Sequence, residues 1–138
     1  MTERSALIFE DEAALRGIFT ELLQRRGYAV DAYPSPAACP PERLELRVGS
    51  LVTARVDLVV SDKNMPPFNG LDFLERKLRE WSPPPAIALM SGFWTESELA
   101  RAHALGFRTF AKPFTLAEFI LWLESVEHAA IPERAAVE

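Results

Sequence analysis

Acidic, hydroxyl and ammonium side chains follow four short apolar stretches of this sequence. Glu10 and Asp11 come directly after the first stretch, Asp62 follows the second, Ser91 the third and Lys112 the fourth. Carboxylates that gather at one place repel one another unless a cation lies among them, and Mg²⁺ prefers oxygen ligands of this kind. A lysine and a hydroxyl beside such a metal suit a phosphoryl group, and a carboxylate can be the nucleophile that accepts it. The set therefore indicates phosphoryl chemistry, provided that the fold brings these residues together.

The apolar stretches themselves predict strands of a parallel sheet. Ala6–Phe9, Leu58–Val60 and Ala86–Met90 are continuous rather than alternating, which is typical of strands that are covered on both faces. Further strands are expected at Tyr28–Ala32 and near Thr109–Ala111. Ligands of an open parallel sheet bind outside the carboxyl ends of its strands, so the polar residues are expected at one edge.

Helical patterns alternate with these strands. Helix N-terminal capping boxes are expected at Thr95 with Glu98 and at Thr115 with Glu118, and Gly27 is a plausible helix stop. Apolar residues at helical spacing form three stripes: Leu15, Ile18, Phe19, Leu22 and Leu23; Leu71, Leu74, Leu78 and Trp81; and Phe119, Ile120, Leu123 and Val126. The alternation predicts an α/β fold, a doubly wound five-stranded parallel sheet with helices on both faces.

Residues 33–56 do not fit this alternation. The segment opens with four prolines, and two alternating apolar stretches then flank Gly49-Ser50. A two-stranded hairpin with a Gly-Ser turn and a covering helix both remain open. Residues 1–130 are expected to form one domain, and residues 131–138 are expected to form a loose polar tail. About ten residues follow the last helical pattern, too few for an output module, and whether the chain stands alone or belongs to a larger protein remains open.

Composition excludes several classes of protein. The 138 residues suit one domain, 49% of them are hydrophobic, and the net charge of −5 argues against direct nucleic-acid binding. The first apolar stretch is too short for a signal peptide or a membrane span, so a cytoplasmic location is expected. Three single residues have no expected part in the chemistry. The lone Cys39 is expected to be an apolar filler or a loop thiol. His103 and His128 are expected at the surface or in packing contacts, because no acid or second histidine stands at the spacing of metal ligands. Phe93 and Trp94 lie close enough to Ser91 to gate the site or meet a partner.

In the order and spacing of its motifs, the sequence resembles the response-regulator receiver domain of two-component signalling, in the CheY-like superfamily. The resemblance covers about residues 5–126. It rests on Ile8-Phe9-Glu10-Asp11-Glu12, Asp57-Leu58-Val59-Val60-Ser61-Asp62-Lys63-Asn64-Met65-Pro66, Leu89-Met90-Ser91-Gly92 and Lys112-Pro113-Phe114. It implies a flavodoxin-like (βα)₅ fold in which residues 33–56 are an atypical connection between the second and third strands.

The resemblance also implies a phosphoacceptor and a metal site. Asp62 would be the phosphorylated aspartate and a ligand of Mg²⁺. Asp11 would bind the ion directly, Glu10 would assist, and Asn64 would contribute its backbone carbonyl. Glu10 stands where an aspartate is frequent in the family, a common variant that keeps the metal site.

Other implied roles concern the switch. Ser91 would hydrogen-bond the phosphoryl oxygens, and Lys112 would pair with Asp62 and form a cis peptide with Pro113. The family's switch aromatic usually lies three positions before the lysine, where this chain has Thr109. Phe110 lies two positions before, and whether it takes the switch role remains open.

The expected function is that of a phosphoacceptor. A sensor histidine kinase or a histidine phosphotransfer protein would supply the phosphoryl group, and the chain would signal to an unknown downstream protein, with a homodimer as one option. It would be no enzyme beyond its own phosphorylation and dephosphorylation. The alternative is a receiver-like interaction module that is not phosphorylated. A phosphatase of the haloacid-dehalogenase type needs a second acid two residues after the nucleophile, where this chain has Asn64. A site for flavin mononucleotide is disfavoured, because Glu10, Asp11 and Asp62 would repel its phosphate without a metal ion.

Overall fold

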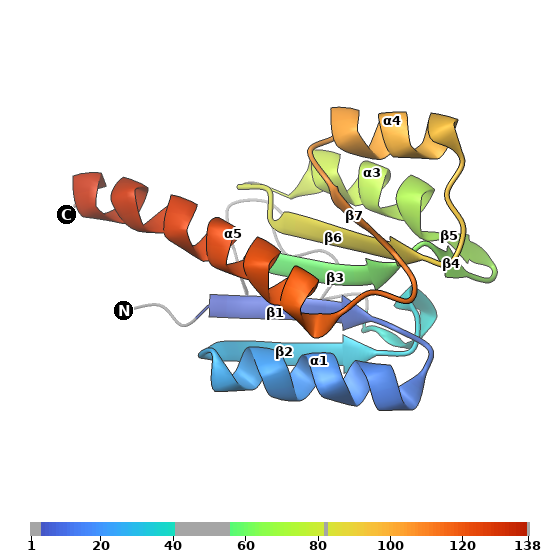
Figure 1. Ribbon diagram of the computed structural model, residues 1–138, viewed down its shortest axis with the longest axis horizontal. Coiled ribbons are helices and arrows are strands. Elements are labelled where there is room, and N and C mark those ends of the chain that lie inside the picture. The colour runs from blue at the N-terminus through green and yellow to red at the C-terminus, as the bar shows by residue number, and fades with distance from the viewer. Residues whose placement is uncertain (1–3, 41–55, 82, 138) are drawn as a thin grey trace.

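A five-stranded parallel sheet forms the centre of the molecule (Figure 1). The computed structural model describes residues 4–40, 56–81 and 83–137, with side chains up to residue 129. The strands stand in the order β2-β1-β3-β6-β7, and all neighbours are parallel. Their bounds are Arg4–Phe9 (β1), Tyr28–Tyr33 (β2), Leu58–Asp62 (β3), Ala86–Ser91 (β6) and Arg108–Ala111 (β7).

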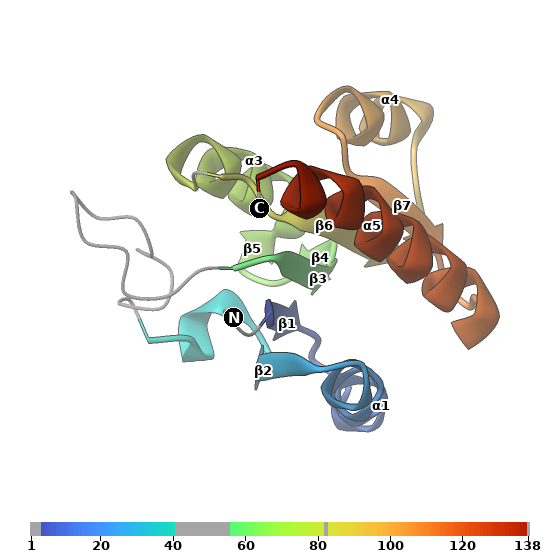
Figure 2. The same ribbon diagram turned by 90° about the vertical axis from the view of Figure 1, so that its left-hand side faces the viewer.

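Two pairs of helices cover the sheet. Helices α1 (Ala13–Arg25) and α5 (Leu116–Val137) pack on one face, and α3 (Gly70–Glu80) and α4 (Glu96–Ala104) pack on the other (Figures 1 and 2). This arrangement confirms the predicted doubly wound α/β fold. None of the helices in the described part of the chain combines the length and the apolar character needed to cross a lipid bilayer.

The central strands are apolar on both faces because both faces are covered. Leu7 and Phe9 of β1 belong to the core under α3 and α4, whereas Ala6 and Ile8 belong to the core under α1 and α5. All four residues are fully buried. The side chains of a strand alternate between its faces, so a strand with two covered faces must be continuously apolar.

Local capping fixes where the helices begin and end. The hydroxyl of Thr95 accepts a hydrogen bond from the Glu98 amide, and the Glu98 carboxylate accepts one from the Thr95 amide, as the predicted capping box requires. At the start of α5, the Thr115 hydroxyl accepts a hydrogen bond from the Glu118 amide, which is one half of the capping box predicted there. Gly27 follows α1 with a φ of 92°, a conformation that favours glycine.

The connection between β2 and β3 is described only at its two ends. A short 3₁₀ helix, η1 (Pro36–Ala38), follows β2, and Cys39 and Val56 are both buried in the core under α3 and α4. Cys39 is therefore a core filler, one of the two roles expected for it. The predicted hairpin or covering helix falls on residues 41–55, which lie outside the described residues.

Two features differ from the sequence-based expectations. Residues 131–137 continue helix α5 to Val137 instead of forming a loose tail. The polar composition suggested a loose end, but alanine, glutamate and arginine are strong helix formers, and the helix continues through Pro132 in spite of the low helix propensity of proline. In addition, β4 (Asn64–Met65) and β5 (Phe68–Asn69) form a small antiparallel hairpin around a cis Pro66–Pro67 bond, a pattern too short to recognise from sequence.

Candidate functional site

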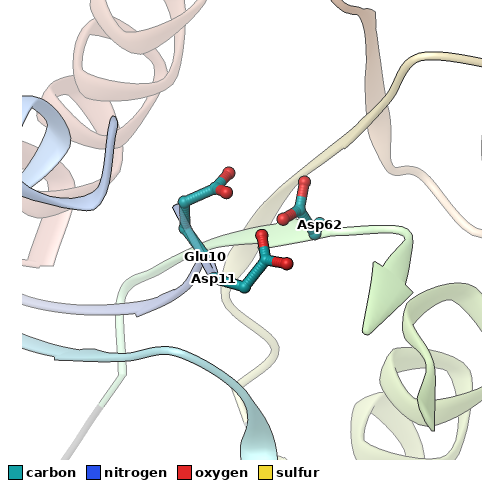
Figure 3. Close-up of side chains that lie close together, drawn as sticks. All are labelled: Glu10, Asp11 and Asp62. Carbon is teal, nitrogen blue, oxygen red and sulfur yellow. The ribbon is translucent and has the colours of Figure 1, made fainter. Parts of the chain in front are cut away.

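The carboxyl ends of β1 and β3 bring three acids together. Phe9 at the end of β1 stands beside Ser61 of β3, so Glu10 and Asp11 emerge next to Asp62. Each of the three residues has a carboxylate oxygen within 4.8 Å of one from each of the others (Figure 3). Glu10 is fully buried, Asp62 is nearly so, and Asp11 is exposed. The cluster is thus open to solvent on its Asp11 side.

Lys112 belongs to the same site and pairs with two of these acids. Its ammonium nitrogen lies 2.7 Å from Asp62 Oδ1 and 3.1 Å from Glu10 Oε1. The Lys112 amide donates to the Ser91 carbonyl at 2.8 Å, which fixes the end of β7 against β6. The Lys112–Pro113 bond is cis, as predicted. One cation therefore contacts two of the three acids.

These contacts perturb two titratable groups. Burial raises the pKa of Glu10 to about 7, the Glu12 amide opposes this shift, and the neighbouring Asp62 adds to it. Burial acts to lower the pKa of Lys112, but its hydrogen bonds and charge interactions with Asp62 and Glu10 outweigh burial, so that this pKa is raised. The site therefore keeps its lysine charged while one of its acids titrates near neutrality.

The donor set fits a hard divalent cation. All three acids offer oxygen, and the exposed side of Asp11 leaves room for the water ligands that Mg²⁺ keeps. Both Glu10 oxygens already have partners, since Oε2 accepts from the Glu12 amide at 3.0 Å and Oε1 contacts Lys112. Asp11 and Asp62 are therefore better placed than Glu10 to bind a cation directly.

Ser91 and Asn64 lie at the same edge but are engaged elsewhere. The Ser91 hydroxyl donates to the Phe93 carbonyl at 2.8 Å and accepts from the Phe93 amide at 3.1 Å. The Asn64 side-chain amide approaches the same hydroxyl at 3.5 Å. Among the described residues, no hydrogen bond joins Ser91 to Asp62. The structure thus brings Ser91 near the acids with its hydroxyl turned towards its own loop.

Phe110 and Thr109 point to opposite faces of the sheet. The Phe110 ring is buried in the core under α1 and α5, with ring centroids of Phe114 and Phe119 at 4.9 Å and 5.8 Å. Thr109 points to the other face, where its hydroxyl lies 3.4 Å from His103 Nε2 on α4. His103 itself is exposed on α4.

Two residues that sequence reasoning did not single out shape the site. Gly70 begins α3 with its amide donating to the Lys63 carbonyl, and a Cβ at this position would overlap the Asp62 carbonyl oxygen. In the sequence, the one sign of this role was a glycine directly before the helical stripe that begins at Leu71. Lys63 is only 3% exposed, and no local pattern distinguishes it from a solvated lysine, because its carboxylate partner Glu98 lies 35 residues away.

Comparisons with known proteins agree with this geometry. Residues 6–124 match the family model described as the response regulator receiver domain. The chain is 34% identical over 116 residues to the alkaline phosphatase synthesis transcriptional regulatory protein SphR of Synechococcus elongatus, covering 83% of this chain and 45% of that protein. It is 29% identical over 114 residues to the KDP operon transcriptional regulatory protein KdpE of Escherichia coli, covering 83% of this chain and 47% of KdpE. The chain thus spans less than half the length of these relatives.

A solved structure extends the match to three dimensions. The non-phosphorylated HemR receiver domain from Leptospira biflexa superposes with a TM-score of 0.73 at 26% identity, covering 90% of this chain and 94% of that one. The sheet order, the acidic cluster at the strand ends and the family match lead to one conclusion: this chain belongs to the response regulator receiver domain family of two-component signalling.

Proposed function

We propose that the chain is a phosphoacceptor whose working residue is Asp62. The observation that carries this proposal is the 2.7 Å contact between the Lys112 ammonium and Asp62 Oδ1 within a cluster of three acids. A carboxylate that is buried, paired with an ammonium and flanked by potential metal ligands has the surroundings that phosphoryl transfer requires. The phosphoryl donor would be a phosphohistidine of a sensor histidine kinase or of a histidine phosphotransfer protein.

In the proposed step, a carboxylate oxygen of Asp62 attacks the phosphorus atom in line with the departing histidine. An O–P bond forms, the P–N bond breaks, and the imidazole nitrogen keeps the electron pair and takes up a proton. Lys112 stays within reach of the new phosphoryl oxygens and compensates their charge. Mg²⁺, held by Asp11, Asp62 and the Asn64 carbonyl with Glu10 assisting, would neutralise charge on the same oxygens. Water later hydrolyses the acyl phosphate and restores Asp62.

Signalling would follow from the rearrangement of Ser91. Its hydroxyl lies at the same edge of the sheet as Asp62, and to reach a phosphoryl oxygen it must leave the Phe93 carbonyl. A ligand shifts a conformational equilibrium by its differential interaction with the two states, so the acyl phosphate would favour the rearranged loop. SphR and KdpE are named as transcriptional regulators. The output here would be an interaction with a downstream protein or domain, or with a second copy of the chain, in the cytoplasm.

Intact mass spectrometry after incubation with Mg²⁺ and phosphoramidate tests this proposal. One added phosphoryl group is expected in the wild type, none in Asp62→Asn, and one in Asp72→Asn, a matched change of an exposed acid on α3. Chelation of Mg²⁺ should suppress the adduct. An unmodified wild type at every donor and metal concentration would sink the proposal and favour an interaction module that is not phosphorylated.

A further inference from the structure

Lys63 is a buried cation directly beside the proposed phosphoacceptor. Its side chain is 4% exposed, and lysines are almost never fully buried without partners. The ammonium donates to the Phe93 carbonyl at 2.5 Å and to Glu98 Oε1 at 2.7 Å. It also lies 4.9 Å from the centroid of the Trp94 ring. All of these partners belong to the segment from the end of β6 to the first turn of α4.

The backbone at Lys63 is held independently of its side chain. Its amide donates to the Met90 carbonyl at 2.7 Å, and its carbonyl accepts from the Gly70 amide at 2.6 Å. The Lys63 ammonium also holds the pKa of Glu98 below its usual value, so this carboxylate stays charged. Because its backbone is held in this way, the Lys63 side chain can fix the position of the loop after β6 by a charge-assisted hydrogen bond and an ion pair.

Lys63 and Ser91 meet on one atom. The Phe93 carbonyl oxygen accepts hydrogen bonds from the Lys63 ammonium and from the Ser91 hydroxyl. When the Ser91 hydroxyl turns towards a phosphoryl group, the Phe93 carbonyl loses that hydrogen bond and keeps the one from the Lys63 ammonium. The balance between the two donors therefore sets where the Phe93 carbonyl lies.

Trp94 connects this carbonyl to β7. The Phe93 carbonyl belongs to the rigid peptide unit that it shares with the Trp94 nitrogen, so a rotation of this unit moves Trp94. The Trp94 indole Nε1–H donates to the Phe110 carbonyl of β7 at 3.1 Å. Thr109, at the position of the family's switch aromatic, instead faces His103 on α4. The described contacts thus offer a path through position 94 and not through position 109.

We propose that Lys63 is a positioning residue for the Ser91 loop and that Trp94 carries the position of this loop to β7. In this chain the Lys63–Phe93–Trp94–Phe110 path would replace coupling through an aromatic residue at position 109. The inference rests on the proposed phosphorylation of Asp62, and its test separates the two.

The test compares ¹H–¹⁵N spectra of the full chain before and after addition of Mg²⁺ and phosphoramidate, with intact mass measured on the same samples. In the wild type, the Trp94 indole signal and the amides of Arg108, Thr109 and Phe110 should shift. Amides at Lys112 are left out because its side chain contacts the phosphoacceptor directly. In Trp94→Phe the adduct should form as in the wild type, while the shifts of the three β7 amides should be lost.

Variants at Lys63 and Thr109 complete the test. Lys63→Met should also lose the β7 shifts with the adduct retained, whereas Lys63→Arg, which keeps a charged donor, should restore them. Thr109→Val should respond as the wild type does. Wild-type β7 shifts in Trp94→Phe, or their loss in Thr109→Val, would overturn the inference. If Lys63→Met does not fold, the β7 shifts of Trp94→Phe and Thr109→Val still decide whether the inference holds. Absence of any adduct in the wild type would count against the proposed function itself.

Discussion

Glu10 and Lys112 form an ion pair in which the carboxylate is fully buried and the ammonium is partly exposed, with 3.1 Å between Oε1 and Nζ. Lys112 divides its charge between this carboxylate and Asp62, so Glu10 is only partly compensated. Burial is the largest cause that raises the pKa of Glu10 to about 7. Around neutral pH the site can therefore gain or lose one proton at Glu10.

This shift predicts that Glu10 lowers stability as the pH rises. Its pKa is about 7 in the folded state and 4.5 in the unfolded state, so the folded state binds more protons between these values. The free energy of unfolding should then fall from pH 4.5 to pH 7, by up to about 3 kcal/mol for this group. Glu10→Gln should remove this component. Urea unfolding of the wild type and of Glu10→Gln, in the presence of a chelator from pH 5 to pH 8, measures this component. If the unfolding free energies of the two proteins change with pH in parallel, the prediction is refuted.

Lys112→Gln should slow phosphorylation of Asp62 while leaving the fold intact. The substitution removes the cation that contacts Asp62 at 2.7 Å, and the loss of one preorganised charge at a reacting group costs about a hundredfold in rate. The rate of adduct formation from phosphoramidate, followed by intact mass, measures the effect. Lys77→Gln, which removes a partly exposed lysine of α3 that pairs with Glu80, is the control and should react as the wild type does. Equal rates in the two variants would remove Lys112 from the mechanism.

Gly70→Ala should destabilise the protein and perturb Asp62. A methyl group at Gly70 would overlap the Asp62 carbonyl oxygen, so the β3 end or the α3 start must move, at a cost of about 1–3 kcal/mol. Gly17→Ala is the matched control. Gly17 lies inside α1 with nothing near its Cβ position, so alanine there should stabilise by about 0.5–1 kcal/mol. Thermal and urea unfolding give both values, and changes of the same sign would contradict the close approach at Gly70.

Glu127→Gln should loosen the attachment of α5 to the sheet. The Glu127 carboxylate contacts Arg26 at 2.6 Å, Arg4 at 3.7 Å and the Tyr28 hydroxyl at 3.1 Å, and it is largely buried. Removing its charge leaves two arginines without their partner, so a loss of about 1–3 kcal/mol is expected. Glu21→Gln breaks an exposed pair with Arg25 and should cost less than about 0.5 kcal/mol. Comparable losses in the two variants would argue against this anchoring role.

The sequence allowed much of the sheet and the acidic cluster to be predicted, because both depend on strong local patterns. The continuous apolar stretch Ala6–Phe9 falls within β1, and Ala86–Met90 falls within β6. Once the strands are parallel, their carboxyl ends must share one edge, and Glu10, Asp11 and Asp62 therefore converge. The capping box of Thr95 and Glu98 is equally local, and it is present.

The remainder depended on tertiary partners that no local pattern reveals. Lys63 is buried because Glu98 and the Phe93 carbonyl come to it from another strand end. Phe110 belongs to the core under α1 and α5, and only the register of β7 against β6 decides that. The helical continuation of residues 131–137 has no clear local signal, because Pro132 opposes the helix that the neighbouring alanine, glutamate and arginine residues favour.

The close approach of Gly70 makes the receiving end of this molecule stiff. Hydrogen bonds hold the Lys63 amide and carbonyl, and the Asp62 carbonyl is packed against the start of α3, so the main chain at the nucleophile has little freedom to yield. A new charge on Asp62 would therefore be accommodated by movements of side chains and of neighbouring segments. In mechanical terms, a main chain held in this way would pass a displacement on to its neighbours instead of absorbing it.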